Sequence, residues 1–240
     1  MKRKKSFINY AHRGAPAYCP ENTLLSFYTG VYMGANGIET DVQRTRDGVL
    51  VLFHDDTLLR VTGENGSVAD YTYDELKPFW VKNGALADKI PTFEDFLAHL
   101  AHFDLTFAIE LKVSGVEKEV ADLIRAYGVE KKTVVTSFIF ECIRDFKAIA
   151  PDIEVGFLTA SVTPLLLSDL KKIGAEELCP KGILVTEERV TEWHAEGFRV
   201  RAWGVTDTEM MKRLYDAGVD GMTVNFPDKL SEYIKTKDTE

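Results

Sequence analysis

The feature that most constrains the fold is a regular alternation of short β-rich runs and longer amphipathic runs along nearly the whole chain. Apolar segments such as 106–112 and 133–138 are each followed by a stretch whose apolar positions recur every three or four residues. This alternation of strands and helices is typical of α/β proteins with parallel sheets. We count eight such strands, which end near His12, Asp41, Lys112, Phe138, Leu158, Pro180, Trp203 and Asn225.

Eight parallel strands alternating with helices in 240 residues favour a (β/α)8 TIM barrel, which typically needs about 250 residues. A doubly wound open sheet is the alternative, but the sequence has no glycine-rich dinucleotide-binding loop to support it. Residues 56–91 interrupt the alternation with glycines, polar residues and several aromatic side chains. We interpret this segment as a small insertion over the active-site face, too short for a core of its own, within a single domain spanning 1–240.

Composition argues against several classes of protein. The chain has 29 Lys and Arg against 38 Asp and Glu, and a net charge of −9 disfavours an extended nucleic-acid-binding surface. The sequence contains no run of about 18 apolar residues and therefore predicts no membrane-spanning helix. The basic residues 2–5 lack the apolar stretch that follows in a signal peptide, and three separated cysteines suit a reducing compartment. We therefore expect a cytoplasmic enzyme.

The predicted strand ends carry an unusual concentration of reactive side chains. In TIM barrels the chemistry lies at the carboxyl ends of the strands, and residues two apart on a strand share a face. Carboxylates, cations and imidazoles should therefore meet at one mouth of the barrel. The strand ends supply His12, Arg13, Glu39, Asp41, Glu110, Lys112 and Trp203.

A predicted hairpin brings a second histidine to this mouth. Two strand-like runs flank Asp47 and Gly48, a pair that favours a two-residue turn. If these two residues are the centre of the turn, Asp41 lies opposite His54, and cross-strand partners have Cβ atoms about 5 Å apart. The inference depends on the turn, because a slip of one residue would point His54 to the other face.

Three carboxylates in one mouth favour a bound cation. Glu39, Asp41 and Glu110 cannot all be ionised cheaply without one, and oxygen ligands suit Mg²⁺ or Ca²⁺, with Mn²⁺ as a further option. Pairing with Arg13 and Lys112 is the alternative, although two cations do not neutralise three anions. A phosphate arriving with a metal ion would engage both cations, and His12 and His54 would then remain for proton transfer.

Taken in order, these motifs resemble the glycerophosphodiester phosphodiesterases. The likeness runs from Ala11 to about Asp228, through AHRG, PENT, GIETDVQRTRDGVLVLFHDDTLLRVTG, PTFEDFL, FAIELK, TSF and RVRAWGV. The resemblance implies a TIM barrel that hydrolyses a small-molecule glycerophosphodiester to an alcohol and glycerol 3-phosphate. It also implies a role for each strand-end residue: acid and base for His12 and His54, metal ligands for Glu39, Asp41 and Glu110, phosphate binding for Arg13 supported by Lys112, and a substrate pocket lined by Trp203.

The sequence is also compatible with other functions. Family members often carry Thr-Asp where this chain has Val224 and Asn225, and they often differ after Trp203, which leaves substrate preference undetermined. A phospholipase D-like enzyme that cleaves a lysophospholipid headgroup is one alternative, and a non-catalytic barrel that binds a phosphometabolite is another. We also expect some aromatic side chains of residues 71–80 to cap the cleft. Headgroup, preferred ion and oligomeric state do not follow from the sequence.

Overall fold

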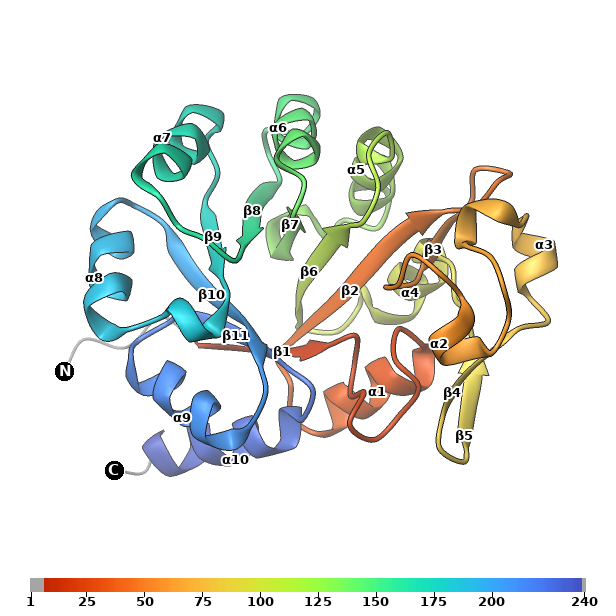
Figure 1. The fold of residues 1–240 in the computed structure, drawn as a ribbon, viewed down its shortest axis with the longest axis horizontal. Coiled ribbons are helices and arrows are strands. Elements are labelled where there is room, and N and C mark those ends of the chain that lie inside the picture. The colour runs from red at the N-terminus through yellow and green to blue at the C-terminus, as the bar shows by residue number, and fades with distance from the viewer. Residues whose placement is uncertain (1–6, 239–240) are drawn as a thin grey trace.

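Eight parallel strands form a closed ring with helices around it, in a computed structural model that describes residues 7–238 (Figure 1). The basic residues 2–5 lie outside the described residues. The barrel strands are β1 (Ile8–His12), β2 (Gly37–Arg44), β6 (Thr106–Leu111), β7 (Thr133–Ser137), β8 (Glu154–Thr159), β9 (Glu177–Pro180), β10 (Arg199–Val205) and β11 (Gly221–Val224). The ring closes because β1 pairs in parallel with both β11 and β2. The predicted (β/α)8 TIM barrel is confirmed.

Helices cover the outside of this ring. They are α1 (Leu24–Tyr32), α4 (Phe93–Leu100), α5 (Glu117–Ala126), α6 (Phe140–Ile149), α7 (Pro164–Ile173), α8 (Glu187–Ala195), α9 (Thr208–Asp216) and α10 (Pro227–Asp238), with single 3₁₀ turns at η2 (Glu130–Lys132) and η3 (Gly182–Leu184). Side chains cap several of them: Thr23 accepts from the Ser26 amide at the start of α1, and Thr92 forms a capping box with Asp95 at α4. Between residues 7 and 238, no helix combines the length and apolar character needed to cross a bilayer.

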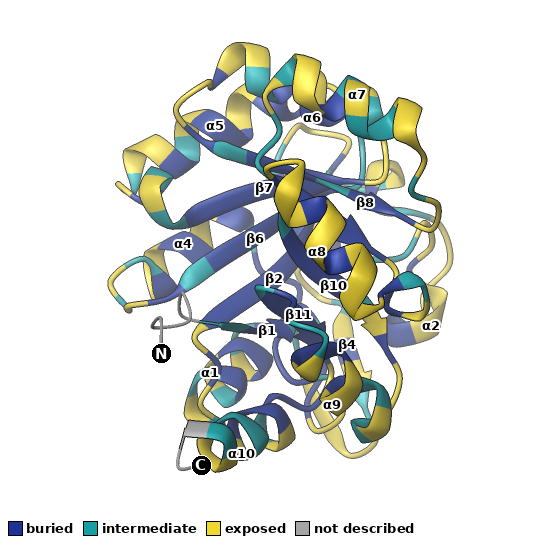
Figure 2. Ribbon diagram, turned by 90° about the vertical axis from the view of Figure 1, so that its left-hand side faces the viewer, coloured by how far each residue is buried: buried dark blue, intermediate teal, exposed yellow. Residues whose placement is uncertain are grey.

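Most of the apolar core lies between the strands and the helices. Buried strand residues face helices whose outer surfaces are exposed (Figure 2). The interior of the barrel is more polar: Arg201 is 2% exposed and donates through Nε to Glu177 and through Nη1 to Thr223. Tyr10 packs beneath the Arg201 guanidinium, which lies 5.1 Å from the ring centroid. The barrel is therefore filled by hydrogen-bonded charges as well as by apolar side chains.

The insertion, residues 56–91, follows the short return strand β3 (Leu50–Leu52), which pairs antiparallel with β2. It contains α2 (Leu59–Thr62), η1 (Val68–Asp70), α3 (Tyr73–Leu76) and an antiparallel pair, β4 (Trp80–Asn83) and β5 (Leu86–Lys89). Its buried side chains form a cluster separate from the barrel core, and Val51 of β3 and Phe53 after it complete that cluster, so the core is shared with the hairpin and does not belong to the segment alone. This cluster comprises Val51, Phe53, Leu58, Val61, Val68, Leu76, Val81 and Ile90.

The aromatic side chains of the insertion support this small cluster. Tyr71, Tyr73 and Phe79 pack against it, and the Tyr71 and Phe79 rings meet edge to face at 5.3 Å. Trp80 is 47% exposed, with the Lys89 ammonium 3.7 Å from the centroid of its ring. The insertion also contacts the loop after β1, because the Asn83 side-chain amide donates to the carbonyls of Pro16 and Cys19.

Candidate active site

A cavity of about 240 Å³ opens at the carboxyl ends of the barrel strands. Six of the eight side chains predicted from the sequence line it; of the remaining two, Asp41 contacts Arg13 and Lys112 contacts Glu110. Among the described residues, none from the insertion lines the cavity, so the expectation that its aromatic side chains cap the cleft was wrong. The lining residues are His12, Arg13, Glu39, His54, Glu110, Phe138, Leu158, Arg201, Trp203, Gly204 and Thr223.

Strand register brings the three carboxylates together. Asp41 on β2 pairs with Glu110 on β6, and Glu39 lies two residues before Asp41 on the same face. All three are nearly fully buried, and each offers an oxygen within 4.8 Å of the others'. Asp41 Oδ1 is buried and has no hydrogen-bond partner among the described residues. An oxygen-only donor set that includes a carboxylate oxygen without a hydrogen bond fits a hard divalent cation.

The pKa values of these groups reflect their crowding. Burial raises the pKa of Glu39 well above its ordinary value, and the charges of Asp41 and Glu110 raise it further. Burial and then Asp41 raise the pKa of Glu110 from 4.5 to about 7. Burial is also the largest influence on Asp41 and acts in the same direction, but Arg13, His54, Lys112 and the hydrogen bond from Asn22 together outweigh it, so the pKa of Asp41 falls below its ordinary value. Without a bound cation, ionising all three buried carboxylates therefore destabilises the folded protein.

Two cations border the carboxylates. Arg13 has a left-handed backbone, with φ of 51°, and its amide donates to Glu39 Oε2 at 3.1 Å. Its Nε lies 3.3 Å from Asp41 Oδ2, and this buried nitrogen makes no hydrogen bond to another described residue. Lys112 Nζ donates to Glu110 at 2.9 Å and lies 3.8 Å from Asp41. Arg13 therefore lines the cavity, whereas Lys112 does not and contacts the carboxylates beside it.

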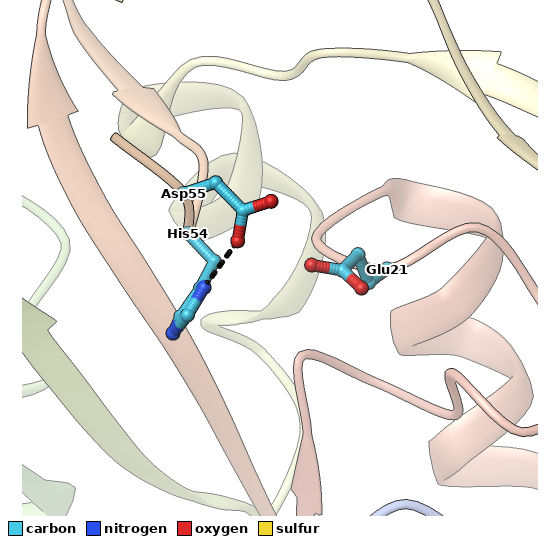
Figure 3. Close-up of side chains that lie close together, drawn as sticks. All are labelled: Glu21, His54 and Asp55. Carbon is cyan, nitrogen blue, oxygen red and sulfur yellow. Dashed lines mark hydrogen bonds and ion pairs between the residues drawn. The ribbon is translucent and has the colours of Figure 1, made fainter. Parts of the chain in front are cut away.

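The two histidines have different hydrogen-bond partners. His12 Nδ1 lies 2.5 Å from the side-chain oxygen of Asn225, and its Nε2 is 4.0 Å from Glu39. Desolvation, followed by the charge of Arg13, lowers the pKa of His12 to about 4. His54 Nδ1 lies 2.7 Å from a carboxylate oxygen of Asp55 (Figure 3). One imidazole is thus paired with a neutral amide and the other with a carboxylate.

His54 reaches the cavity by a different route from the one predicted. The turn has three residues, Arg46–Gly48, because the Thr45 amide donates to the Val49 carbonyl and Gly48 takes a φ of +90°. Asp41 is therefore opposite Phe53, and the predicted pairing with His54 was wrong by one residue. His54 still lines the cavity because β3 ends at Leu52, so strand alternation no longer fixes its direction.

An apolar wall forms the far side of the cavity. Phe138 and Trp203 meet edge to face with their centroids 5.0 Å apart, and Leu158 lies beside them. The Trp203 indole donates to the Cys179 carbonyl at 3.0 Å, which fixes its orientation. Sequence reasoning assigned no role to Phe138, Leu158 or Asn225, although each closes a predicted strand. The strand-end rule that found His12 would have found them as well.

Fold and site together define a phosphodiesterase built on a TIM barrel. Residues 12–229 match the model of the glycerophosphoryl diester phosphodiesterase family, and the chain belongs to this family. A glycerophosphodiester phosphodiesterase from Bacillus altitudinis is 36% identical, over 92% of this chain and 95% of that protein. One from Caldanaerobacter subterraneus is 32% identical, over 94% of this chain and 96% of that protein.

A solved structure supports the fold assignment. A phosphodiesterase from Oleispira antarctica, in complex with the product sn-glycerol-3-phosphate, matches this chain with a TM-score of 0.86. The match covers 95% of this chain and 96% of the other at 24% sequence identity. At that identity the likeness concerns the fold.

Proposed function

We propose that this enzyme hydrolyses glycerophosphodiesters to an alcohol and sn-glycerol 3-phosphate, with one divalent cation held by Glu39, Asp41 and Glu110. The observation that supports this most strongly is one cavity whose lining combines two imidazoles, two of the three clustered carboxylates and the Arg13 guanidinium. The relatives named for the same reaction support it as well. A bound Mg²⁺, Ca²⁺ or Mn²⁺ would act as a Lewis acid on a phosphoryl oxygen and relieve the repulsion among the carboxylates.

The residues around the cation position the phosphate and the leaving group. Arg13 lines the cavity and offers its guanidinium charge to a phosphoryl oxygen, and Lys112 supplies a second positive charge beside the carboxylates. The wall of Phe138, Leu158 and Trp203 faces the same cavity and accepts the alcohol portion of the substrate. The phosphodiester is thereby held between the charged floor and the apolar wall.

The partners of the two histidines favour one assignment of roles. The Asn225 oxygen accepts a hydrogen bond from Nδ1–H of His12, which leaves Nε2 of the neutral ring free to accept a proton. The Asp55 carboxylate accepts a hydrogen bond from Nδ1 of His54, which orients the ring and leaves Nε2 for proton transfer to the leaving group. We assign His12 as the base and His54 as the acid of the first step.

The nucleophile of that step is the hydroxyl of the glycerol carbon next to the esterified oxygen. An internal hydroxyl held in place has an entropic advantage over free water. His12 takes its proton as the oxygen bonds to phosphorus, and His54 protonates the departing alkoxide, which leaves a cyclic phosphate. Water then opens the ring, with His54 taking the proton of the water and His12 returning its proton to the glycerol oxygen.

A substrate analogue tests this route. Replacing the glycerol 2-hydroxyl with hydrogen removes the internal nucleophile, so the analogue should bind but turn over far more slowly than its parent. Hydrolysis of the analogue at a comparable kcat would show that water attacks phosphorus directly.

A substrate panel tests the proposed function itself. Glycerophosphodiesters of glycerol, choline, ethanolamine and inositol should be assayed with Mg²⁺, Ca²⁺ and Mn²⁺, with lysophosphatidylcholine alongside. We expect turnover of glycerophosphodiesters that depends on the added ion. Preferential cleavage of lysophosphatidylcholine would replace this proposal with a phospholipase D-like activity.

A further inference from the structure

Arg60, a residue of the insertion, lies beside the active site but does not line the cavity. Arg60 on α2 lies between two carboxylates that come from different loops. Its Nε and Nη2 donate to Asp55 at 2.5 and 2.9 Å, and its Nη1 and Nη2 donate to Glu21 at 2.9 and 2.6 Å. A guanidinium is suited to this geometry, because its planar fork engages a carboxylate through two parallel hydrogen bonds.

The carboxylates that Arg60 holds each contact a residue of the proposed mechanism. Asp55 contacts His54 Nδ1 at 2.7 Å, and Glu21 accepts from Arg13 Nη1 at 2.9 Å. Figure 3 shows Glu21 facing Asp55 and His54 from the loop after β1. A continuous chain of charged contacts therefore runs from Arg13 through Glu21, Arg60 and Asp55 to His54.

This cluster is not a second metal site. Glu21, His54 and Asp55 offer ligand atoms within 4.8 Å of one another, a spacing that would accommodate an ion. However, both carboxylates are already engaged by Arg60, and Glu21 is also engaged by Arg13. The guanidinium of Arg60 lies between the two carboxylates, in the place where a metal ion would have to bind.

We propose that Arg60 is a positioning residue that orients His54 through Asp55 and so couples the insertion to catalysis. This inference rests on the proposed role of His54 in proton transfer. Asp55 has little else to fix it, because the described residues that its carboxylate contacts are His54 and Arg60. Without Arg60, Asp55 is free to leave the imidazole, and His54 loses the contact that sets its ring orientation.

The stability of the fold should depend little on Arg60. The Arg60 side chain is 50% exposed, whereas those of Glu21 and Asp55 are 14% and 21% exposed. Glu21 keeps Arg13 as a partner when Arg60 is replaced, so we expect only a modest loss of stability. Outer contacts that orient catalytic groups, by contrast, typically change activity about 10–100-fold when removed. Replacing Arg60 should therefore lower kcat more than it lowers the melting temperature.

The test compares Arg60→Met with Arg46→Met in the full-length enzyme. Arg46 is a matched control because it also joins the insertion to the barrel, through Glu75 and the Asp70 carbonyl, without contacting the site. We expect Arg60→Met to lower kcat about 10–100-fold with little change in melting temperature, and Arg46→Met to retain wild-type kcat. Arg60→Lys, which keeps a cation between the carboxylates, should retain more activity than Arg60→Met.

A double-mutant cycle separates positioning from a general structural effect. If Arg60 acts through Asp55, Arg60→Met should lower kcat less than about 3-fold in an Asp55→Asn background, because the two changes interrupt one contact chain. Wild-type kcat in Arg60→Met, or an equal loss in both backgrounds, would overturn the inference. A wild-type enzyme inactive on every glycerophosphodiester would instead overturn the proposed function.

Discussion

Replacing Glu110 with glutamine should stabilise the metal-free protein at high pH while weakening its response to metal ions. The carboxylate is 6% exposed, and its pKa rises from 4.5 to about 7. At about 1.4 kcal/mol per pH unit, this corresponds to a destabilisation of up to about 3 kcal/mol. The folded protein holds this proton more tightly than the unfolded chain, so stability falls as the pH rises from about 4.5 to about 7. Above pH 7 the full cost is present, and Glu110→Gln removes it.

Thermal unfolding in the presence of a chelator measures this effect. For a chain of this length, about 2–4 °C per kcal/mol predicts that Glu110→Gln melts up to about 10 °C above wild type at pH 8. At pH 5 most of the difference should vanish. Added Mg²⁺ or Ca²⁺ should raise the wild-type melting temperature more than that of the variant, because the variant has lost one ligand charge.

Glu64→Gln is the matched control for this test. Glu64→Gln removes a carboxylate from an exposed position of the insertion and should change neither the melting temperature nor the metal response. If Glu110→Gln melted below wild type at pH 8 with chelator present, the crowded carboxylates would not be the source of strain, and the reasoning would be refuted.

Three further predictions concern the histidines, the pH profile and the aromatic side chains of the cavity and the insertion. His12→Ala and His54→Ala should each lower kcat about 10²–10⁴-fold, and near-normal turnover of either variant would remove that histidine from the mechanism. The acidic limb of kcat/KM against pH should lie below the ordinary range of histidine, because desolvation and Arg13 lower the pKa of His12 to about 4; an acidic limb near pH 6.5 would contradict this. Trp203→Ala should change the ratio of kcat/KM values between headgroups, whereas Phe79→Ala should lower only the melting temperature; a headgroup effect of Phe79→Ala would show that the insertion contacts substrate.

The barrel strands and the residues at their carboxyl ends could be predicted from the sequence. Each barrel strand is an apolar run bounded by helix signals, and the convergence of Glu39, Asp41 and Glu110 follows from strand alternation and from the arrangement of a TIM barrel. The hairpin register depended instead on one glycine. Gly48 takes a positive φ in a three-residue turn, and a two-residue turn has a similar sequence.

The contacts around the histidines could not be read from sequence spacing. Asn225 meets His12 across 213 residues, and Arg60 meets Glu21 across 39. Such side-chain pairs depend on how loops from different strands pack at the barrel mouth, and strand periodicity does not describe loops. The cluster inside the insertion was missed for a related reason: residues of β3 and Phe53 complete it, so the segment looks too small by itself.

The proposed enzyme hydrolyses a glycerophosphodiester with the help of a cation held by Glu39, Asp41 and Glu110. Phosphorus NMR of glycerophosphocholine incubated with the purified, chelator-treated enzyme, before and after addition of Mg²⁺ or Ca²⁺, tests this proposal most directly. We expect no turnover without the ion and, after its addition, a single final phosphorus product, sn-glycerol 3-phosphate. Full activity in the chelator, or phosphocholine as the product, would contradict the proposal.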